Sequence, residues 1–156
     1  MERKYITCDT ELCTGCGICE MVCSAEKEGV FYPELSRIHL ARIDEKTAMS
    51  IACRFCENTP CISACPREAL KMDEDNNVIQ VDKMRCTGCG WCIEACDFGA
   101  IVLNRSTKSV VLCDLCEGSS QPKCVELCPK QALKVSTLEL EAQSAREKSA
   151  KSLTSG

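Results

Sequence analysis

Residues 86–96 read Cys86-Thr87-Gly88-Cys89-Gly90-Trp91-Cys92-Ile93-Glu94-Ala95-Cys96, with the cysteine spacing C-x2-C-x2-C-x3-C. Three thiols two residues apart can surround one corner of a compact metal cluster. The fourth follows a wider gap, and we expect it one turn into a short helix, pointing toward a different cluster. The small residues Thr87, Gly88 and Gly90 allow tight bends that aim backbone N–H groups at the sulfurs.

This element occurs four times along the 156 residues. Each run has four cysteines and ends in C-x3-C, and the spacings in chain order are 2-2-3, 2-4-3, 2-2-3 and 2-7-3. Sixteen of the 17 cysteines therefore form four sets of four, and only Cys8 is left over. The runs are Cys13, Cys16, Cys19 and Cys23; Cys53, Cys56, Cys61 and Cys65; Cys86, Cys89, Cys92 and Cys96; and Cys113, Cys116, Cys124 and Cys128.

Cysteine at this density has three ordinary explanations. Disulfides need an oxidising compartment, and the N-terminal residues Met1 to Ile6 contain no apolar signal core. Zinc sites usually consist of two C-x2-C pairs separated by roughly a dozen or more residues. The runs here instead have three closely spaced cysteines followed by a fourth. Iron–sulfur ligation fits the spacing directly, so the sequence predicts four [4Fe-4S] clusters whose iron is bound by the sixteen cysteines of the runs. Bound metal would also supply folding free energy that a core poor in aromatic residues lacks.

Charge and composition exclude several functions. The formal net charge is −4, and four oxidised clusters with their thiolates would bring it to roughly −12. This charge argues against nucleic acid as a partner and favours a protein with a basic docking surface. No apolar run approaches the roughly 18 residues of a membrane span, so we expect a cytoplasmic protein without one. No phosphate-binding glycine loop or nucleophile–base pair is present, so no catalytic residue is predicted.

Short strands are expected around the runs. The five residues that follow the last cysteine of runs two, three and four are similar, and we call this segment the tag (66–70, 97–101 and 129–133). The tag reads as a turn that leads into a strand, and it predicts strands at 69–72, 100–103 and 132–135. Matching strands are expected ahead of the runs at 5–8, 78–81 and 110–112, with a hairpin turn at 75–77. Between runs one and two, alternation over 35–43 predicts a strand with a hairpin partner at 48–53.

The four spacings together resemble those of the four-cluster ferredoxin-like electron-transfer subunits of tungsten- and molybdenum-pterin oxidoreductases, over residues 5–136. Within that group, the segment from Glu28 to Ile38 is similar to the small iron–sulfur subunits that accompany aldehyde ferredoxin oxidoreductase-type tungsten enzymes. The resemblance implies an α+β fold of two nested, bacterial-type two-cluster ferredoxin units. Residues 5–52 with 104–136 would form the outer unit, 53–103 the inner unit, and 137–156 a C-terminal helix with a flexible tail.

The same resemblance implies which cysteines share a cluster. The spacing alone leaves open a second arrangement, two tandem ferredoxins that pair run one with run two and run three with run four. The sets that the resemblance implies are Cys13, Cys16, Cys19 and Cys128; Cys23, Cys113, Cys116 and Cys124; Cys53, Cys56, Cys61 and Cys96; and Cys65, Cys86, Cys89 and Cys92.

The function expected from these features is one-electron transfer by a subunit that is not an enzyme by itself. The implied partners are a catalytic pterin-containing subunit and a second electron carrier, either a flavin-containing protein or a ferredoxin, and self-association stays open. Two alternatives remain: a free polyferredoxin, and the iron–sulfur subunit of a formate dehydrogenase, a hydrogenase or a benzoyl-CoA reductase complex.

Five single residues carry further expectations. Ser24 and Asp97 stand where the ferredoxin pattern has proline, and the Asp97 carboxylate should lower the reduction potential of an adjacent cluster. Trp91 is expected to shield a cluster from water. His39 is expected to be an ordinary surface or interface residue, and Cys8 a buried structural cysteine.

Overall fold

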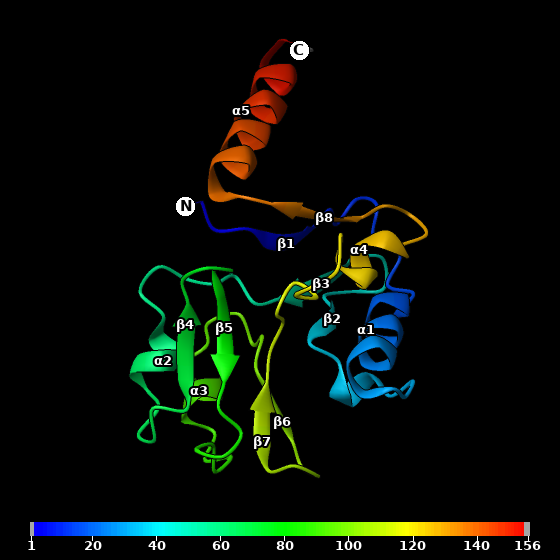
Figure 1. Ribbon diagram of the computed structural model, residues 1–156. Helices are drawn as coiled ribbons and strands as arrows, with labels where there is room; N and C mark the ends of the chain where they lie inside the picture. Colours follow the sequence, from blue (N-terminus) through cyan, green and yellow to red (C-terminus); the bar gives the residue numbers. More distant parts are fainter. Residues whose placement is uncertain (1, 155–156) are drawn as a thin grey trace.

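The computed structural model describes residues 2–154 as a succession of short strands and helices (Figure 1). The strands are β1 (Tyr5–Cys8), β2 (Ile38–Arg42), β3 (Ala48–Ala52), β4 (Leu70–Asp73), β5 (Val78–Val81), β6 (Val102–Asn104), β7 (Ser109–Val111) and β8 (Leu133–Ser136). The helices are α1 (Ile18–Glu28), the 3-10 helix η1 (Pro33–Leu35), α2 (Pro60–Ser63), α3 (Trp91–Glu94), α4 (Lys123–Glu126) and α5 (Leu138–Thr154). The α+β class expected from the sequence is therefore present.

Each strand pairs antiparallel with one other strand of the described chain, so the sheets have two strands each. Three pairs are hairpins: β2–β3, β4–β5 and β6–β7. The fourth pair joins the two ends of the domain, with Tyr5 of β1 opposite Ser136 of β8 and Cys8 opposite Leu133. Each pair connects the segment after one cysteine run to the strand before the next, and β8–β1 closes this cycle from run four to run one.

The three hairpin turns share one local device. An Asp or Asn side chain accepts hydrogen bonds from the backbone N–H groups two and three residues later, which replaces the ladder bonds that end at the turn. The acceptors are Asp44 (to Lys46 and Thr47, 2.8 and 2.7 Å), Asp73 (to Asp75 and Asn76, 3.0 and 3.4 Å) and Asn104 (to Ser106 and Thr107, 3.0 and 3.3 Å). The turn predicted at 75–77 is thus confirmed between β4 and β5.

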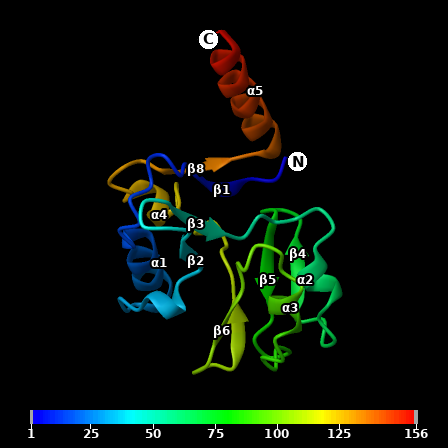
Figure 2. The same cartoon turned by 180° about the vertical axis from the view of Figure 1, so that it is seen from behind.

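Views from opposite sides show two lobes beneath the β1–β8 pair (Figures 1 and 2). One lobe contains α2, α3, β4 and β5, the other contains α1, α4, β2 and β3, and the β6–β7 hairpin lies between them. Helix α1 packs against α4, and α2 packs against α3. The buried cluster mixes cysteines with the fully buried side chains of Phe55, Ile38, Leu70 and Val110. The sulfurs are therefore part of the core.

Helix α5 projects away from both lobes (Figures 1 and 2), and none of its residues is buried. It occupies most of the segment 137–156, for which the sequence predicts a helix and a flexible tail. The last two residues, 155 and 156, lie outside the described residues.

The bounds of six strands differ from the predicted ones: β2 is shorter than residues 35–43, β3 ends one residue early, β7 lies one residue early, and the three strands that follow a tag begin late. Strands β1 and β5 begin and end where the sequence predicts, whereas β4 and β8 begin one residue late and β6 two residues late. The cause is local, because the tag alanines Ala69 and Ala100 donate their N–H groups to a cysteine sulfur instead of a neighbouring strand.

Candidate iron–sulfur sites

The helices position the third cysteine of each run. Cys61, Cys92 and Cys124 lie within the one-turn helices α2, α3 and α4, which end before the fourth cysteine. The expectation that the helix carries the last cysteine is therefore wrong for these three runs, since C-x3-C spans a full turn and each helix lasts only that long. Run one differs, because α1 is 11 residues long and contains both Cys19 and Cys23.

An aspartate turn precedes each of the two 2-2-3 runs, a feature that the sequence analysis missed. The Asp9 carboxylate accepts the N–H of Glu11 at 2.9 Å, and the Asp82 carboxylate accepts that of Met84 at 2.9 Å. The carbonyls of the same aspartates accept the N–H groups of the first cysteines, Cys13 and Cys86, both at 2.9 Å. The shared spacing D-x3-C was the signal that could have revealed these turns.

The tag after the fourth cysteine forms a second recurrent turn. Its third residue donates its N–H to the cysteine carbonyl and has a positive φ: Glu68 (+50°), Gly99 (+61°) and Gln131 (+51°). The next residue is the buried alanine of the tag, Ala69, Ala100 or Ala132. A backbone with left-handed φ turns the chain back over the cysteine, and the small alanine then fits beside the sulfur.

Backbone N–H groups approach the sulfurs of six cysteines at 3.3–3.5 Å. Hydrogen bonds of this kind stabilise thiolates and are one of the means by which proteins set the potential of iron–sulfur clusters. The donors and acceptors are Arg37 to Cys23, Phe55 to Cys53, Ala69 to Cys65, Ala100 to Cys96, Val110 to Cys86 and Leu115 to Cys113.

Two cavities are each lined by four cysteines from two different runs. The first also has Ile18, Leu40 and Leu133 in its wall, and the second has Pro60 and Ile79. Most of the remaining lining is apolar, which limits access of water. The cysteines are Cys13, Cys16, Cys19 and Cys128 in the first cavity, called site A, and Cys53, Cys56, Cys61 and Cys96 in the second, called site C.

Two further groups of sulfurs lie close enough to interact electrostatically. Burial raises the pKa of Cys113 well above its ordinary value, and the nearby sulfurs of Cys124 and Cys23 raise it further. Burial, followed by the sulfurs of neighbouring cysteines, also raises the pKa of Cys92 to about 11. The groups are Cys23, Cys113, Cys116 and Cys124, called site B, and Cys65, Cys86, Cys89 and Cys92, called site D.

These arrangements fit a cluster better than a single ion. None of the 17 cysteines is paired in a disulfide. Within residues 2–154, no three Cys, His, Asp or Glu side chains converge as the ligands of one metal ion do. At sites A and C the four thiols line a cavity, which suits a cluster that offers each thiolate its own iron. Bound iron would replace the protons of these thiols, whose pKa values are raised by burial and then by the neighbouring sulfurs.

The single residues of the sequence analysis have varied surroundings. Trp91 is 63% exposed, so most of its ring faces solvent. His39 is half-buried in β2, and burial lowers its pKa. Cys8 is half-buried at the end of β1, where burial raises its pKa to about 11. Asp97 is exposed and lines the cavity of site C.

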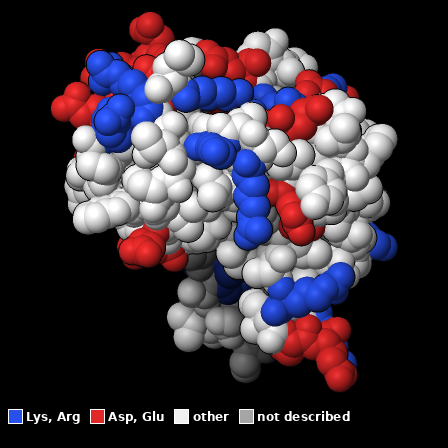
Figure 3. Space-filling model, turned by 90° about the horizontal axis from the view of Figure 1, so that it is seen from below, with Lys and Arg blue, Asp and Glu red and all other residues white. Residues whose placement is uncertain are grey.

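Charged side chains of both signs are interspersed on the face shown in Figure 3, with uncharged surface between them. Neither sign covers that face as a continuous patch. Across residues 2–154, none of the helices combines the length and the apolar character needed to cross a bilayer.

Similar proteins share the cysteine-rich part of the chain. A family model described as "4Fe-4S dicluster domain" matches residues 45–138, which contain runs two, three and four. The polyferredoxin-like subunit of aliphatic sulfonate oxidoreductase from Pyrococcus furiosus is 39% identical, over 87% of this chain and 79% of that protein. The thiosulfate reductase electron transfer subunit PhsB from Salmonella typhi is 35% identical, over 84% of this chain and 74% of that protein.

A solved structure has the same fold over nearly the whole chain. The active site complex BamBC of benzoyl coenzyme A reductase in complex with zinc matches with a TM-score of 0.54 and 25% identity, over 99% of this chain and 91% of the other. Because the family model spans three of the four cysteine runs and both relatives align with most of the chain, the protein belongs to the 4Fe-4S dicluster domain family and binds [4Fe-4S] clusters.

Proposed function

We propose that the protein is an electron-transfer subunit that binds four [4Fe-4S] clusters, one at each of sites A to D. The observation that carries this proposal is the gathering of cysteines from two runs at each site, with backbone N–H groups directed at their sulfurs. A bound [4Fe-4S] cluster exchanges one electron at a time. The chain's own contribution is to hold the thiolates, to donate hydrogen bonds to them and to exclude water.

The proposed arrangement is nested. Residues 5–52 with 104–136 form the outer unit, which contains sites A and B, and residues 53–103 form the inner unit, which contains sites C and D. Two contacts support it: β1 pairs with β8, and α1 packs against α4. Both join run one to run four, as an outer unit requires and as two tandem ferredoxins do not.

Point variants distinguish the two arrangements. Cys16→Ser and Cys128→Ser should alter the midpoint potential and the EPR signal of one and the same cluster, since serine is a poorer iron ligand. Cys23→Ser and Cys116→Ser should both alter another. In the tandem arrangement, Cys16 and Cys128 belong to different two-cluster units, so their variants would alter different signals.

The proposed catalytic partner is a tungsten- or molybdenum-pterin subunit of the aldehyde oxidoreductase type, and the chain relays electrons between it and a flavin-containing protein or a ferredoxin. The segment from Glu28 to Ile38 supports this choice of enzyme type. The names of the relatives support a role as the non-catalytic subunit of an oxidoreductase. The proposed compartment is the cytoplasm, where reducing conditions keep closely spaced thiols available as iron ligands.

A second candidate is the corresponding subunit of a benzoyl-CoA reductase complex. It is favoured by the structural match to BamBC, which extends over nearly the full length of both chains. The two candidates share the four-cluster relay and differ in the substrate of the catalytic partner.

Anaerobic purification of the protein from its native host tests the proposal. We expect it to elute in a complex larger than the single chain, with tungsten or molybdenum in the co-purifying subunit. The chain itself should contain about 16 iron and 16 sulfide ions, four for each cluster. Elution as a lone chain would indicate a free polyferredoxin, nickel in the partner would indicate a hydrogenase, and about eight iron ions would indicate only two clusters.

A further inference from the structure

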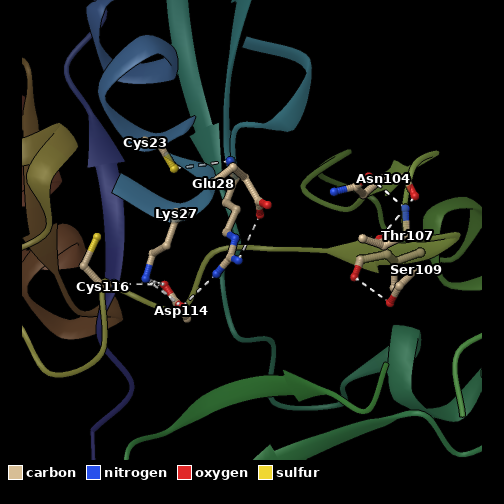
Figure 4. A network of polar contacts seen from close by, with 10 residues as sticks. Cys23, Lys27, Glu28, Asn104, Thr107, Ser109, Asp114 and Cys116 are labelled. Atoms are coloured by element: carbon tan, nitrogen blue, oxygen red, sulfur yellow. Dashed lines mark hydrogen bonds and ion pairs between the residues drawn. The ribbon is translucent and has the colours of Figure 1, made fainter. Parts of the chain in front are cut away.

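The Asp114 carboxylate lies between two cations from distant parts of the chain (Figure 4). The Lys27 ammonium, in α1, is 2.7 Å from Oδ1 and 2.8 Å from Oδ2. The Arg37 guanidinium, which precedes β2, is 2.8 Å from Oδ2. The side chains of Lys27, Arg37 and Asp114 are only 15%, 16% and 25% exposed, so solvent screens these pairs less than it screens a surface salt bridge.

Two members of this network form hydrogen bonds with cysteines of site B, and the third lies next to one of them on α1. The Arg37 backbone N–H donates to the Cys23 sulfur at 3.3 Å. The Asp114 carboxylate accepts the N–H of Cys116 at 3.1 Å and directly follows Cys113 in the chain. Lys27 lies one helical turn after Cys23. The network therefore ties the part of site B that comes from run one to the part that comes from run four.

The charges of the network are balanced. The Nη2 atom of the Arg37 guanidinium lies 3.5 Å from the Glu28 carboxylate, so the network contains two cations and two carboxylates. Removing one member would leave a half-buried charge of known sign beside site B. Coulomb interactions at such short range are strong when partly shielded from water, so the sign of that charge should be measurable.

We propose that Lys27, Arg37 and Asp114 are positioning residues that hold site B together and set its reduction potential through their charge balance. This inference rests on the proposed four-cluster function. It differs from a purely structural role in one respect. Removing the positive member of the ion pair must shift the reduction potential in one direction, and removing the negative member must shift it in the other. A network that only braced the fold would not distinguish the sign of the charge removed.

The test is a redox titration of the anaerobic, cluster-loaded full chain followed by EPR. Lys27→Gln should lower the midpoint potential of one cluster, because a nearby positive charge is lost and an added electron is less stabilised. Asp114→Asn should raise the midpoint of the same cluster. The double variant should lie close to the unaltered protein, and the other three midpoints should not move.

Conservative and remote variants provide the controls. Lys27→Arg and Asp114→Glu keep both charges and should keep the midpoint. The exposed Lys134 and the partly buried Glu141 form a pair of the same chemistry at 3.3 Å, and Lys134→Gln or Glu141→Gln should move no midpoint. Iron and sulfide are counted in every preparation, so that loss of a cluster is distinguished from a shift of its potential.

The outcomes separate two failures. If the unaltered chain contains fewer than four clusters, the proposed function is wrong, whatever the variants do. If the unaltered chain contains four clusters, three outcomes would overturn the inference about the network and leave the proposed function standing. Lys27→Gln and Asp114→Asn could shift the midpoint in the same direction, or they could shift no midpoint. They could also lose a cluster that the charge-conserving variants lose as well.

Discussion

The Ser50 hydroxyl of β3 lies 3.2 Å from the Cys19 sulfur of α1, and both residues are buried. The two are 31 residues apart in sequence, so the β2–β3 hairpin brings a side-chain donor to site A from outside the cysteine runs. When Cys19 is a thiolate, only the hydroxyl can donate this bond. Removing a donor to a cluster sulfur disfavours the added electron.

We therefore predict that Ser50→Ala lowers the midpoint potential of the cluster proposed for site A and leaves the other midpoints unchanged. The measurement is a redox titration followed by EPR, with iron content as the check on loading. Ser106→Ala, in the β6–β7 turn, is the matched control because the Ser106 contact is made by its backbone N–H. If Ser50→Ala leaves every midpoint unchanged, the hydroxyl does not act on site A.

Two glycines of run three separate steric contact from backbone strain. Gly88 and Gly90 both have positive φ, +68° and +87°. A Cβ on Gly88 would lie 2.8 Å from the Lys108 carbonyl oxygen, whereas a Cβ on Gly90 would meet nothing within 4 Å. Gly90→Ala should therefore cost only the left-handed conformation, about 1–2 kcal/mol, and Gly88→Ala should cost more.

The measurement is the temperature at which the visible absorbance of the clusters is lost on anaerobic heating. Because this loss is irreversible, both variants are compared at one heating rate. If both variants lower this temperature equally, the Lys108 carbonyl moves away from the added Cβ without a cost in stability.

Local features of the fold could be predicted from the sequence, and contacts between distant segments could not. β1, β5 and the turn at 75–77 follow from residue type and spacing within a few positions. The pair Lys27–Asp114 joins residues 87 positions apart, and the bond from Val110 to Cys86 joins residues 24 apart. Nothing in the local sequence around either member indicates its partner, because the approach depends on how the hairpins and α1 pack.

The tag shows a different limit. The sequence predicts that the alanine of the tag begins the following strand. In the structure it belongs to the turn, where Ala69 donates to the Cys65 sulfur. Glu68 and Gln131 have positive φ without being glycine, so residue type did not reveal the left-handed turn that delays the strand.

The aspartate turn ahead of run three should stabilise the cluster that uses Cys86. Asp82 accepts N–H groups from Met84 at 2.9 Å and from Arg85 at 3.3 Å, and its carbonyl holds the Cys86 N–H. Asp82→Ala removes the two side-chain bonds, worth about 1 kcal/mol each. We predict faster loss of iron to a chelator, measured anaerobically by absorbance. Lys83→Ala is the control on the same turn, and equal rates for the two variants would argue against the prediction.

Asp97 supplies a test of charge at site C. Its exposed side chain lines the cavity that Cys96 shares with three other cysteines. A carboxylate beside a cluster disfavours an added electron, so Asp97→Asn should raise the midpoint of the cluster proposed for site C. Asp75→Asn, on the exposed β4–β5 turn, removes the same charge elsewhere and should leave every midpoint unchanged. A titration of Asp97→Asn identical to that of the unaltered protein would remove Asp97 as a determinant of potential.

Cys8 is the one cysteine outside the four runs. Whether it binds iron tests the assignment of the other sixteen cysteines as the ligands. Its sulfur lies at the end of β1, near the cysteines of run one and 4.0 Å from the Asp9 carbonyl oxygen. Burial raises the pKa of the Cys8 thiol to about 11, so without a metal it stays protonated at neutral pH. We predict that Cys8→Ala retains the iron and sulfide content of the unaltered chain, whereas Cys13→Ala loses one cluster or part of it. Equal iron loss in both variants would make Cys8 a ligand in place of one of the four cysteines at site A.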